Sequence, residues 1–406
     1  MKLKKCRSCK SKNLKKLFSL GNMCFTGKFP KENQKIQKKP IVLVMCNKCK
    51  LVQLGHNFDL NYLYGPDYGY RTGINKTMLD HVKNVVKNLS QKTRLSKKDL
   101  VLDIASNDGS LLKYYKSGVT KFGIDPILNK YIDEYKDVKY KVSSFFSANK
   151  IKNLTKKRKF KIITALSVFY DAADPNKFLK DIKNLLHNQG VCLLEFADLA
   201  SIIKFKMFDT ICHEHLEYYS SNVIINLCKK NGLRVFDIKK NKINGASKQF
   251  YICHKNSKYP ENHNIIKKEV IIENKMKLSK LETFKRFIKE INDSRKKLVK
   301  FLKQKVKLGK KIHCYGASTK GNVLLQYYKI NNKMISYAAE RNENKYNLYT
   351  PGTKIKIISE VLSRFYNPDY YLVLPWHFKN EILLREKFMR KKGTKFIFPL
   401  PKIEIV

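Results

Sequence analysis

Residues 100–112 read LVLDIASNDGSLL, and this stretch decides the fold. An apolar run ends at Asp103, a loop of small residues follows, and Gly109 precedes the start of an expected helix. A strand, a glycine-bearing loop and a helix form a unit that binds nucleotide-like ligands at the carboxyl end of a parallel strand. Only Gly109 is present, so the loop lacks the full G-x-G-x-x-G pattern. The stretch predicts a Rossmann-like unit.

The same pattern continues on both sides of this unit. Residues 121–125, KFGID, predict a second strand that ends at Asp125, where an acid can hold both hydroxyls of a ribose. Further strands are expected at 161–166 and 190–195, with helices at 77–89 and 174–186. This alternation predicts an α/β domain with a parallel, doubly wound sheet over residues 61–255.

A second block repeats the arrangement near the end of the chain. Residues 311–322, KIHCYGASTKGN, predict a strand, a turn and a helix, and further strands are expected at 334–340 and 370–375. The turn carries Ser318, Thr319 and Lys320, whose groups suit a pyrophosphate. We expect a smaller Rossmann-like domain over 311–406, and the alternative is a scaffold that binds no ligand. Residues 256–310 predict one or two long helices that connect the domains.

The first 60 residues form a separate module with two C-x-x-C pairs, Cys6 with Cys9 and Cys46 with Cys49. Two such pairs in turn-like contexts predict one tetrahedral four-thiolate zinc site. Four thiolates leave no open position for water, so the site would be structural. The alternative is four unrelated buried cysteines, and Cys24 is expected to be a free or packed thiol.

Length and composition narrow the function. A chain of 406 residues is too long for one core, and it has no apolar run of 18 residues and no secretion signal at its start. These features and the metal-type cysteines predict a protein of the reducing cytoplasm that does not span a membrane. The net charge of +51 would attract nucleic acid or small anions. The lysines are spread along the whole chain without a nucleic-acid-binding motif, which argues against nucleic acid as the partner.

Residues 208–220, FDTICHEHLEYYS, carry the candidate chemistry. His213, Glu214 and His215 can move protons near neutral pH. If this segment is extended, His213 and His215 point to one face and Glu214 to the other. The two histidines are too close for the zinc-protease pattern. The alternative is a strand end with solvated polar residues.

Taken in order, these motifs resemble one known family, and the resemblance covers nearly the whole chain. The four-cysteine module, DIASNDGSLL, FDTICHEHLEYYS, INGAS and YGASTKGN are similar to the motifs of S-adenosylmethionine (SAM)-dependent C-methyltransferases that act on nucleotide sugars. Such enzymes add a methyl group to C3 of an NDP-4-keto-deoxyhexose. The resemblance implies a zinc module, a class I methyltransferase domain and a Rossmann-like nucleotide-sugar domain. It also favours a monomer.

The resemblance implies roles for individual residues. The cofactor would be held by the first methyltransferase motif, by the acid after the second strand and by an aromatic loop that precedes them: Asp103, Ala105, Asn107, Asp108, Gly109, Asp125 and Tyr70. The nucleotide sugar would be held by Ser318, Thr319, Lys320, Asn322, Glu340, Trp376 and His377. The structural zinc ligands would be Cys6, Cys9, Cys46 and Cys49.

The catalytic step implied by the resemblance needs a base. A neighbouring ketone makes the C3 proton acidic, and His215 is expected to remove it and give an enolate. Glu214 or His213 would orient this base or stabilise the enolate oxygen, and a pKa near neutrality suits it.

Two positions depart from the family pattern. Cys212 stands where many members have Tyr, so His213, Tyr218 or Tyr219 would have to supply a hydroxyl or its equivalent. The usual N-G-G-S-x-R is here 244–249, NGASKQ, with Lys248 near the position of the lost Arg. Both changes leave the sugar and the regiochemistry open.

Other functions compete with this interpretation. An O- or N-methyltransferase acting on a nucleotide sugar needs no enolate, and the sequence does not separate it from a C-methyltransferase. A zinc- and nucleic-acid-binding protein on a Rossmann scaffold fits the charge, but it has no need of Asp103, Asp125 or the 213–215 segment. A methyltransferase acting on tRNA would need an RNA-binding module, of which the sequence has no signature.

Overall fold

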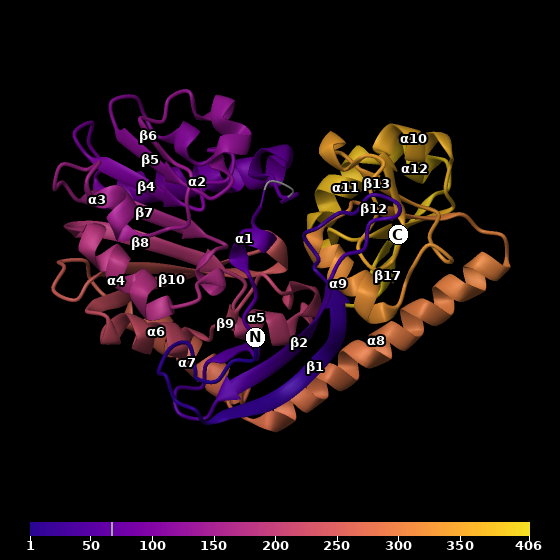
Figure 1. The fold of residues 1–406 in the computed structure, drawn as a ribbon, viewed down its shortest axis with the longest axis horizontal. Helices are drawn as coiled ribbons and strands as arrows, with labels where there is room; N and C mark the ends of the chain where they lie inside the picture. The colour runs from indigo at the N-terminus through magenta and orange to yellow at the C-terminus, as the bar shows by residue number, and fades with distance from the viewer. Residues whose placement is uncertain (66–67) are drawn as a thin grey trace.

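The computed structural model describes residues 1–65 and 68–406. Figure 1 shows two α/β lobes side by side, with a long β ribbon and one long helix running beneath both. Within the described residues, no helix combines the length and the hydropathy that a membrane span requires. The two lobes are the two Rossmann-like units expected from the sequence.

The first lobe contains a seven-stranded sheet in the order β10-β11-β8-β7-β4-β5-β6. Strands β8, β7, β4, β5 and β6 are parallel, as expected, and β11 pairs antiparallel with both β8 and β10. The strands are β4 (Leu100–Ile104), β5 (Thr120–Ile124), β6 (Tyr140–Val142), β7 (Phe160–Leu166), β8 (Leu186–Phe196), β10 (Leu233–Asn241) and β11 (Ser247–His254).

Helices cover both faces of this sheet, as in a doubly wound fold. The helix expected at 174–186 is α4 (Pro175–Leu185), whose N-cap Asp174 accepts hydrogen bonds from the amides of Asn176 and Lys177. The other helices are α1 (Leu60–Leu63), α2 (Lys76–Thr93), α3 (Ala148–Lys152), α5 (Leu199–Lys204) and α6 (Ser221–Lys230).

The helix expected directly after β4 does not form. Only the 3-10 helix η2 (Leu112–Tyr114) follows, because β5 already begins at Thr120 and the segment is too short for a helix and a return. A second 3-10 helix, η3 (Leu128–Tyr135), follows β5. The loop after β4 is therefore held by side-chain hydrogen bonds instead of by a long helix.

The second lobe has a six-stranded sheet in the order β14-β13-β12-β15-β16-β17, parallel except for β17. Its strands are β12 (Ile312–Tyr315), β13 (Tyr337–Glu340), β14 (Lys356–Ser359), β15 (Tyr370–Val373), β16 (Lys395–Phe398) and β17 (Glu404–Ile405). Its helices are α9 (Thr319–Tyr328), α10 (Glu360–Phe365), α11 (Lys379–Arg385) and α12 (Lys387–Lys391).

The connecting segment is helical, as expected. It contains α7 (His263–Lys275) and α8 (Leu281–Lys307), and α8 is the long helix beneath both lobes in Figure 1. Phe284, Phe287 and Ile291 of α8 are buried at helical spacing, and Phe18 packs against both phenylalanines. Residues of the N-terminal module, α8 and the second lobe share one hydrophobic core.

The N-terminal module is completed by a strand from the first lobe. Its antiparallel sheet has the order β1-β2-β3-β9, formed by β1 (Leu14–Cys24), β2 (Lys38–Cys46), β3 (Val52–Leu54) and β9 (Glu217–Tyr218). Strand β9 directly follows the 213–215 segment. The module therefore fixes the position of this segment through β9.

Candidate active site

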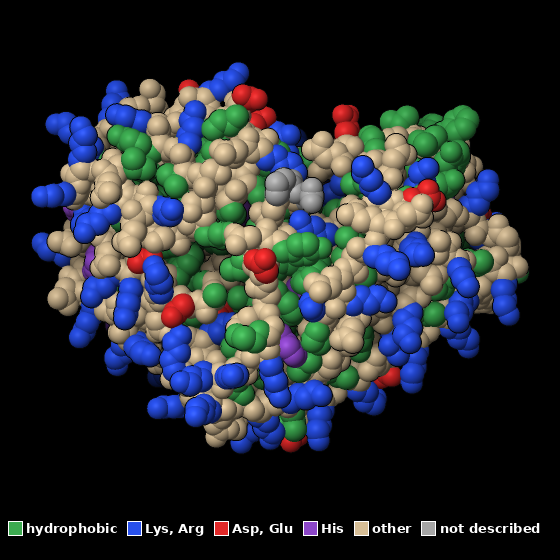
Figure 2. Space-filling view, viewed as in Figure 1, with side chains coloured by type: hydrophobic (Ala, Val, Ile, Leu, Met, Phe, Trp, Pro, Cys, Tyr) green, Lys and Arg blue, Asp and Glu red, His purple; other side chains and the backbone are tan. Residues whose placement is uncertain are grey.

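A cavity of about 640 Å³ lies between the two lobes. It is lined by the loops after β4, β5 and β7 in the first lobe and by the loops after β12, β13 and β15 in the second. Figure 2 shows a notch between the lobes on one face, with lysine and arginine side chains spread over both lobes. The carboxyl ends of both parallel sheets thus open into one space, which is where such folds bind ligands.

Asp125 and Asp103 line the first-lobe end of the cavity. The carboxylate of Asp125 accepts the amide of Asn107 at 2.9 Å and the amide of Ile127 at 2.8 Å. Asp103 accepts the hydroxyl of Thr164 at 2.6 Å. Burial raises the pKa of Asp103 to about 7, against the effect of the Thr164 hydrogen bond, and Asp125 adds to the rise.

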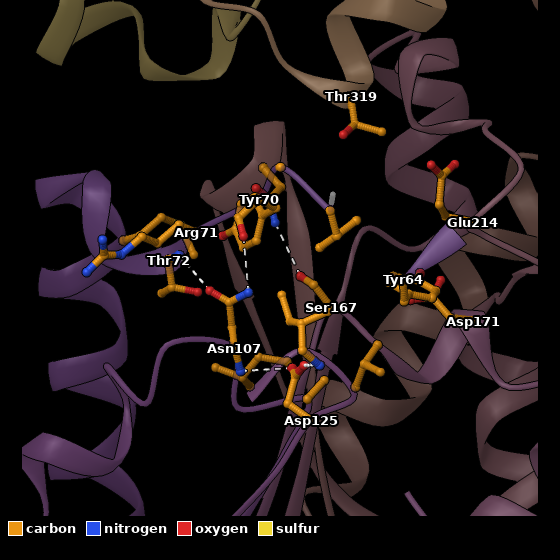
Figure 3. Close-up of a pocket in the computed structure, with 18 of the residues that line it drawn as sticks. Tyr64, Tyr70, Arg71, Thr72, Asn107, Asp125, Ser167, Asp171, Glu214 and Thr319 are labelled. Atoms are coloured by element: carbon orange, nitrogen blue, oxygen red, sulfur yellow. Dashed lines mark hydrogen bonds between the residues drawn. The ribbon is translucent and has the colours of Figure 1, made fainter. Parts of the chain in front are cut away.

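The aromatic loop that carries Tyr70 is tied to the loop after β4. Asn107 accepts the amide of Thr72 at 2.9 Å and donates to the carbonyl of Tyr70 at 3.2 Å, and Figure 3 draws both bonds. Asp108 accepts the amide of Gly73 at 2.9 Å and Nε of Arg71 at 3.2 Å. These bonds hold Tyr70 against the cavity.

The predicted cofactor residues therefore fall into two groups. Tyr70, Asp103, Ala105, Asn107 and Asp125 line the cavity, whereas Asp108 and Gly109 lie behind it. Gly109 has a φ of +72°, and a Cβ there would lie 3.2 Å from the ring of Tyr135. Asp108 and Gly109 shape the loop and do not line the binding space.

The 213–215 segment is not extended, so the condition under which His213 and His215 would share a face is not met. The chain between η5 (Phe208–Thr210) and β9 is irregular, and Glu214 and His215 line the cavity. His213 is fully buried between Phe25 and Phe58, with ring centroids 4.7 Å and 4.9 Å away. Its Nε2 lies 3.1 Å from the carbonyl of Lys39.

Tyr219 also lies outside the cavity. It is fully buried and stacks on Phe169 at a centroid distance of 4.9 Å. Cys212 and Tyr218 are buried as well and do not line the space. His213, Tyr218 and Tyr219 therefore cannot replace the tyrosine hydroxyl that is missing at Cys212. The tertiary structure is the reason, because the chain around β9 turns these side chains into the core below the cavity.

A hydrogen bond from the Nδ1 nitrogen fixes the orientation of the His215 ring. Nδ1 donates to the carbonyl of Thr210 at 2.7 Å, so Nε2 is the unprotonated nitrogen of the neutral ring. The ring packs against Tyr170 at 4.2 Å. Burial lowers the pKa of His215 to about 4, which the nearby Glu214 only partly offsets. This pKa is below the near-neutral value expected from the sequence, and it keeps the ring uncharged at pH 7.

Glu214 is held as an acceptor from two sides. Its carboxylate accepts the amide of Gly27 at 3.1 Å and the hydroxyl of Thr26 at 3.2 Å. A Cβ on residue 27 would lie 2.9 Å from Oε1 of Glu214, so only glycine allows this approach. The N-terminal module thus holds Glu214 in its position at the floor of the cavity.

Several cavity residues were missed by the sequence analysis. Tyr64, Tyr68, Tyr170 and Asp171 lie beside Glu214 and His215. Figure 3 shows Tyr64, Asp171 and Glu214 on one side of the cavity and Asn107 and Asp125 on the other. The signal for Asp171 was available, since it closely follows the expected strand 161–166 at the ligand-binding edge of the sheet.

The second lobe repeats the geometry of the first. Glu340, at the end of β13, accepts the amides of Ala317 and Arg341 at 2.8 Å and of Asn342 at 3.0 Å. Burial raises the pKa of Glu340, but Lys345 and these amides outweigh it and hold the pKa below its usual value. Asp125 in the first lobe and Glu340 in the second thus have the same role. Each is an acid at the end of its lobe's second parallel strand, and each accepts a backbone amide of the loop that follows the first strand.

The remaining predicted substrate residues are divided between the cavity and the lobe interface. Ser318, Thr319, Lys320, Glu340 and His377 line the cavity, whereas Asn322 and Trp376 do not.

Asn322 and Trp376 bind the first lobe and the N-terminal module instead. Asn322 donates to the carbonyl of Thr26 at 2.8 Å, and Nε1 of Trp376 donates to Asp209 at 2.8 Å. Lys320 donates to the carbonyl of Asn244 at 2.9 Å. These contacts join the second lobe to the rest of the chain at the cavity wall.

Positive groups that the sequence analysis did not select also line the second lobe's side of the cavity. They are Arg341, which directly follows Glu340, together with Lys345 and Arg385. Arg341 donates to Oδ1 of Asn75 at 2.5 Å and lies 3.8 Å from Glu381.

The position of the lost Arg is filled by Gln249, and Lys248 points elsewhere. Gln249 donates to Oε2 of Glu195 at 2.5 Å, and Nε2 of His81 lies 2.7 Å from Oε1 of the same carboxylate. Glu195 and His81 line the cavity. Lys248 is buried among carboxylates away from it, so it does not replace the Arg at the site.

The four predicted zinc ligands form one cluster. The Sγ atoms of Cys6, Cys9, Cys46 and Cys49 all lie within 4.8 Å of one another, and the Cys6–Cys49 and Cys9–Cys46 pairs are 3.6 Å and 3.5 Å apart. A tetrahedral zinc with Zn–S bonds of about 2.3 Å needs edges of about 3.8 Å. The donor set and the spacing fit zinc.

Cys24 lies apart from this cluster. Its Sγ donates to the carbonyl of Ile36 at 3.5 Å, as expected for a packed thiol.

Three family models match successive parts of the chain. A zinc binding domain matches residues 6–64, a methyltransferase domain matches 75–238, and a C-methyltransferase C-terminal domain matches 242–401. The three matches follow one another along the chain and together cover most of it. The chain is a SAM-dependent methyltransferase that carries a four-cysteine zinc module.

A curated protein is similar to this chain over most of its length. C-methyltransferase NovU from Streptomyces niveus is 25% identical over 369 residues, which are 90% of this chain and 87% of NovU.

Solved structures match smaller parts of the chain. A SAM-dependent methyltransferase from Clostridium acetobutylicum has a TM-score of 0.35 and 14% identity, covering 43% of this chain and 92% of that chain. Magnesium protoporphyrin IX methyltransferase from Synechocystis, with bound S-adenosylhomocysteine (SAH), has a TM-score of 0.33 and 14% identity, covering 45% and 88%.

Proposed function

We propose that this C-methyltransferase methylates C3 of an NDP-4-keto-deoxy sugar, with His215 as the base. The observation that carries the proposal is a neutral imidazole whose Nε2 faces a two-ended cavity, with its tautomer fixed by the Thr210 carbonyl. A cavity of about 640 Å³ is within the range of about 300–1,000 Å³ for small-molecule sites. Methylation at carbon needs such a base, because the C3 proton must leave first.

The first-lobe end of the cavity suits SAM. Asp125 has the place of the ribose acid, and Asn107 and Ala105 form the loop beside it. Asp103 would face the positively charged methionine part of the cofactor, and the ring of Tyr70 would close the space from outside. When bound here, SAM supplies a sulfonium methyl group that a carbon nucleophile can accept.

The second-lobe end suits a nucleotide diphosphate. Ser318 caps α9, the amides at the start of that helix face the loop, and Thr319 lines the cavity beside them. Lys320, Arg341 and His377 add donors to this wall. Glu340 holds the loop in the same way that Asp125 does in the first lobe. A nucleotide sugar bound here would extend its sugar toward Glu214 and His215.

The chemistry at the cavity floor follows from this placement. Nε2 of His215 takes the C3 proton of the keto sugar, and the electron pair of that bond moves toward the carbonyl oxygen. The carbonyl of Thr210 holds the proton already on Nδ1 and stabilises the imidazolium that forms. Glu214 adds a negative charge nearby, which favours that charged form. The carbon then accepts the methyl group.

The test is His215→Ala, assayed for SAH binding, for methyl transfer and for exchange of the C3 hydrogen with deuterium from solvent. We expect unchanged SAH affinity, with loss of both transfer and exchange of about 100- to 10,000-fold. The matched control is His263→Ala, because His263 has an 81% exposed side chain far from the cavity wall. Exchange at a normal rate in His215→Ala would remove His215 from the role of base.

The same assay separates carbon from oxygen or nitrogen methylation. In the wild-type enzyme, exchange at C3 without the methyl donor supports an enolate. Transfer of a methyl group to the substrate without any exchange at C3 would mean O- or N-methylation.

A further inference from the structure

Asp171 is a buried acid at the cavity floor that the steps above do not use. It ends the 3-10 helix η4 (Phe169–Asp171), which follows β7 at the ligand-binding edge of the first sheet. Figure 3 shows its side chain beside Tyr64 and near Glu214, on the side of the cavity away from Asp125. The amide of Leu216 donates to the carbonyl of Tyr170 at 2.8 Å, so η4 is fixed directly against the 213–215 segment.

The hydrogen bonds around the two floor carboxyl groups differ. Glu214 accepts from the Thr26 hydroxyl on Oε2 and from the Gly27 amide on Oε1, so both of its oxygens have a donor. Asp171 has a hydrogen bond with the hydroxyl of Tyr64, and its Oδ1 is buried without a partner among the described residues. Asp171 lines the cavity, and a buried carboxyl oxygen without a partner is expected to gain one when a ligand binds.

The charges around Asp171 also oppose its ionisation. The carboxyl groups that face it belong to Glu214 and Glu217. The other titratable neighbours are the thiol of Cys212 and the phenols of Tyr64, Tyr68, Tyr170, Tyr218 and Tyr219. None of these groups carries a positive charge. Burial, followed by the charges of Glu214 and Glu217, raises the pKa of Asp171 well above its usual value, despite the Tyr64 hydrogen bond.

We propose that Asp171 is a neutral carboxylic acid that donates its proton to the ketone oxygen of the substrate while His215 removes the C3 proton. This inference rests on the proposed function. It assigns the donor that the chain lacks at Cys212, whose buried thiol does not reach the cavity. Asp171 and His215 lie on neighbouring segments of the same floor, so an acid and a base can act on adjacent atoms of one sugar ring.

The step balances without any further reactant. The C3–H bond breaks, its proton goes to Nε2 of His215, and its electron pair forms the C3=C4 bond of an enol. The C4=O π pair takes the proton of Asp171 to give the enol hydroxyl. When C3 accepts the methyl group, the C4 carbonyl forms again and the hydroxyl proton returns to Asp171. The net proton released is the one on His215, which passes to solvent.

Two variants test the donor. Asp171→Asn keeps a hydrogen-bond donor of the same shape, and Asp171→Ala removes it. We expect Asp171→Ala to lower kcat and C3 exchange by about 100- to 1,000-fold, with little change in KM or SAH affinity. We expect the rate of Asp171→Asn to lie between those of wild type and Asp171→Ala, because its amide can donate a hydrogen bond to the ketone oxygen but cannot transfer a proton to it.

Infrared spectroscopy tests the protonation state of the Asp171 carboxyl group directly, and it does not depend on the activity of the variants. The difference spectrum between wild type and Asp171→Asn at pH 7 should contain the carbonyl stretch of a carboxylic acid. The control Asp293→Asn changes an aspartate with a 47% exposed side chain on α8 and should remove only carboxylate bands. Loss of only carboxylate bands in Asp171→Asn would overturn the inference.

The outcomes separate this inference from the proposed function. If the wild-type enzyme exchanges C3 hydrogen and Asp171→Ala exchanges it equally fast, Asp171 is not the donor, while the proposed function stands. If the wild-type enzyme neither exchanges nor methylates C3, the proposed function itself fails. If Asp171→Asn and Asp171→Ala lose SAH affinity together with activity, Asp171 has a structural role only, and the inference is refuted.

Discussion

Replacing Lys248 with methionine is expected to destabilise the first lobe far more than replacing its cross-strand neighbour Lys240. Lys248 is 2% exposed, and its Nζ lies 2.8 Å from Glu273, 3.0 Å from Asp198 and 3.1 Å from Glu269. Lys240 pairs with the same Glu269 at 2.6 Å, but its side chain is 53% exposed. The two lysines are direct partners in the β10–β11 register.

The size of the effect follows from burial. Removing one partner of a buried ion cluster costs about 3–5 kcal/mol, because uncompensated charges remain in the interior. Asp198 and Glu273 keep hydrogen bonds from backbone amides, those of Ala200 and Ser221, so the cost should be about 3 kcal/mol, at the lower end of this range. An exposed pair such as that of Lys240 is worth about 0–1 kcal/mol.

Amide hydrogen exchange of β11 measures this difference without requiring the whole chain to unfold in one step. At about 1.4 kcal/mol per tenfold change, exchange of peptides covering 247–254 should be about 100-fold faster in Lys248→Met. The Lys240→Met control should stay within about fivefold of wild type. Methionine fills nearly the same volume as the lysine stem, so packing changes little in either variant.

The pH dependence gives a second readout with a definite sign. Burial raises the pKa of Glu269, but the hydrogen bonds and charges of Lys240 and Lys248 outweigh it, and the pKa lies below 4.5. A depressed pKa contributes stability above the unfolded value, and this stability is lost as the pH falls through the folded pKa. The difference in β11 amide exchange rate between wild type and Lys248→Met should therefore become smaller below about pH 4.5. Equal exchange rates in the Lys240 and Lys248 variants at pH 7 would refute the reasoning.

Two further predictions concern the ligands. Cys6→Ser should lose the bound zinc and have a lower melting temperature, because the four-thiolate set is broken, whereas the control Cys24→Ser should keep one zinc per chain. Metal analysis measures the zinc content, and full zinc content in Cys6→Ser would exclude Cys6 as a ligand. SAH affinity, measured by calorimetry, should rise between pH 6 and 8 as Asp103, with its pKa of about 7, becomes ionised beside the ammonium group of the ligand. An equally steep rise in Asp103→Asn would contradict this assignment.

Part of the site could be predicted because it depends on positions along the backbone. Asp103, Asp125 and Glu340 lie at the carboxyl ends of strands that the sequence predicts, and parallel strands bring such ends to one edge. The four zinc ligands were predictable for a similar reason. Two C-x-x-C turns can each present two thiolates, and one metal ion needs four.

The floor of the cavity could not be predicted in the same way. The expectation for the 213–215 segment assumed an extended chain, but β9 pairs with β3 of the zinc module and leaves the residues before it irregular. This pairing turns His213 into an aromatic core and turns Glu214 toward Gly27. Neither contact has a local signal, because the partners are separated by almost 200 residues of chain.

The sequence by itself determined the two Rossmann-like units, the zinc ligands and the acids at the strand ends, because apolar periodicity and short motifs fix local structure. Only the tertiary structure decided which of the neighbouring groups His213, Glu214, His215 and Tyr219 face the cavity, and that Asp171 joins them there. The physical reason is that burial and hydrogen-bond partners set the orientation and the charge of a titratable group. Those partners come from the zinc module and from β7, which the fold alone brings to the same place.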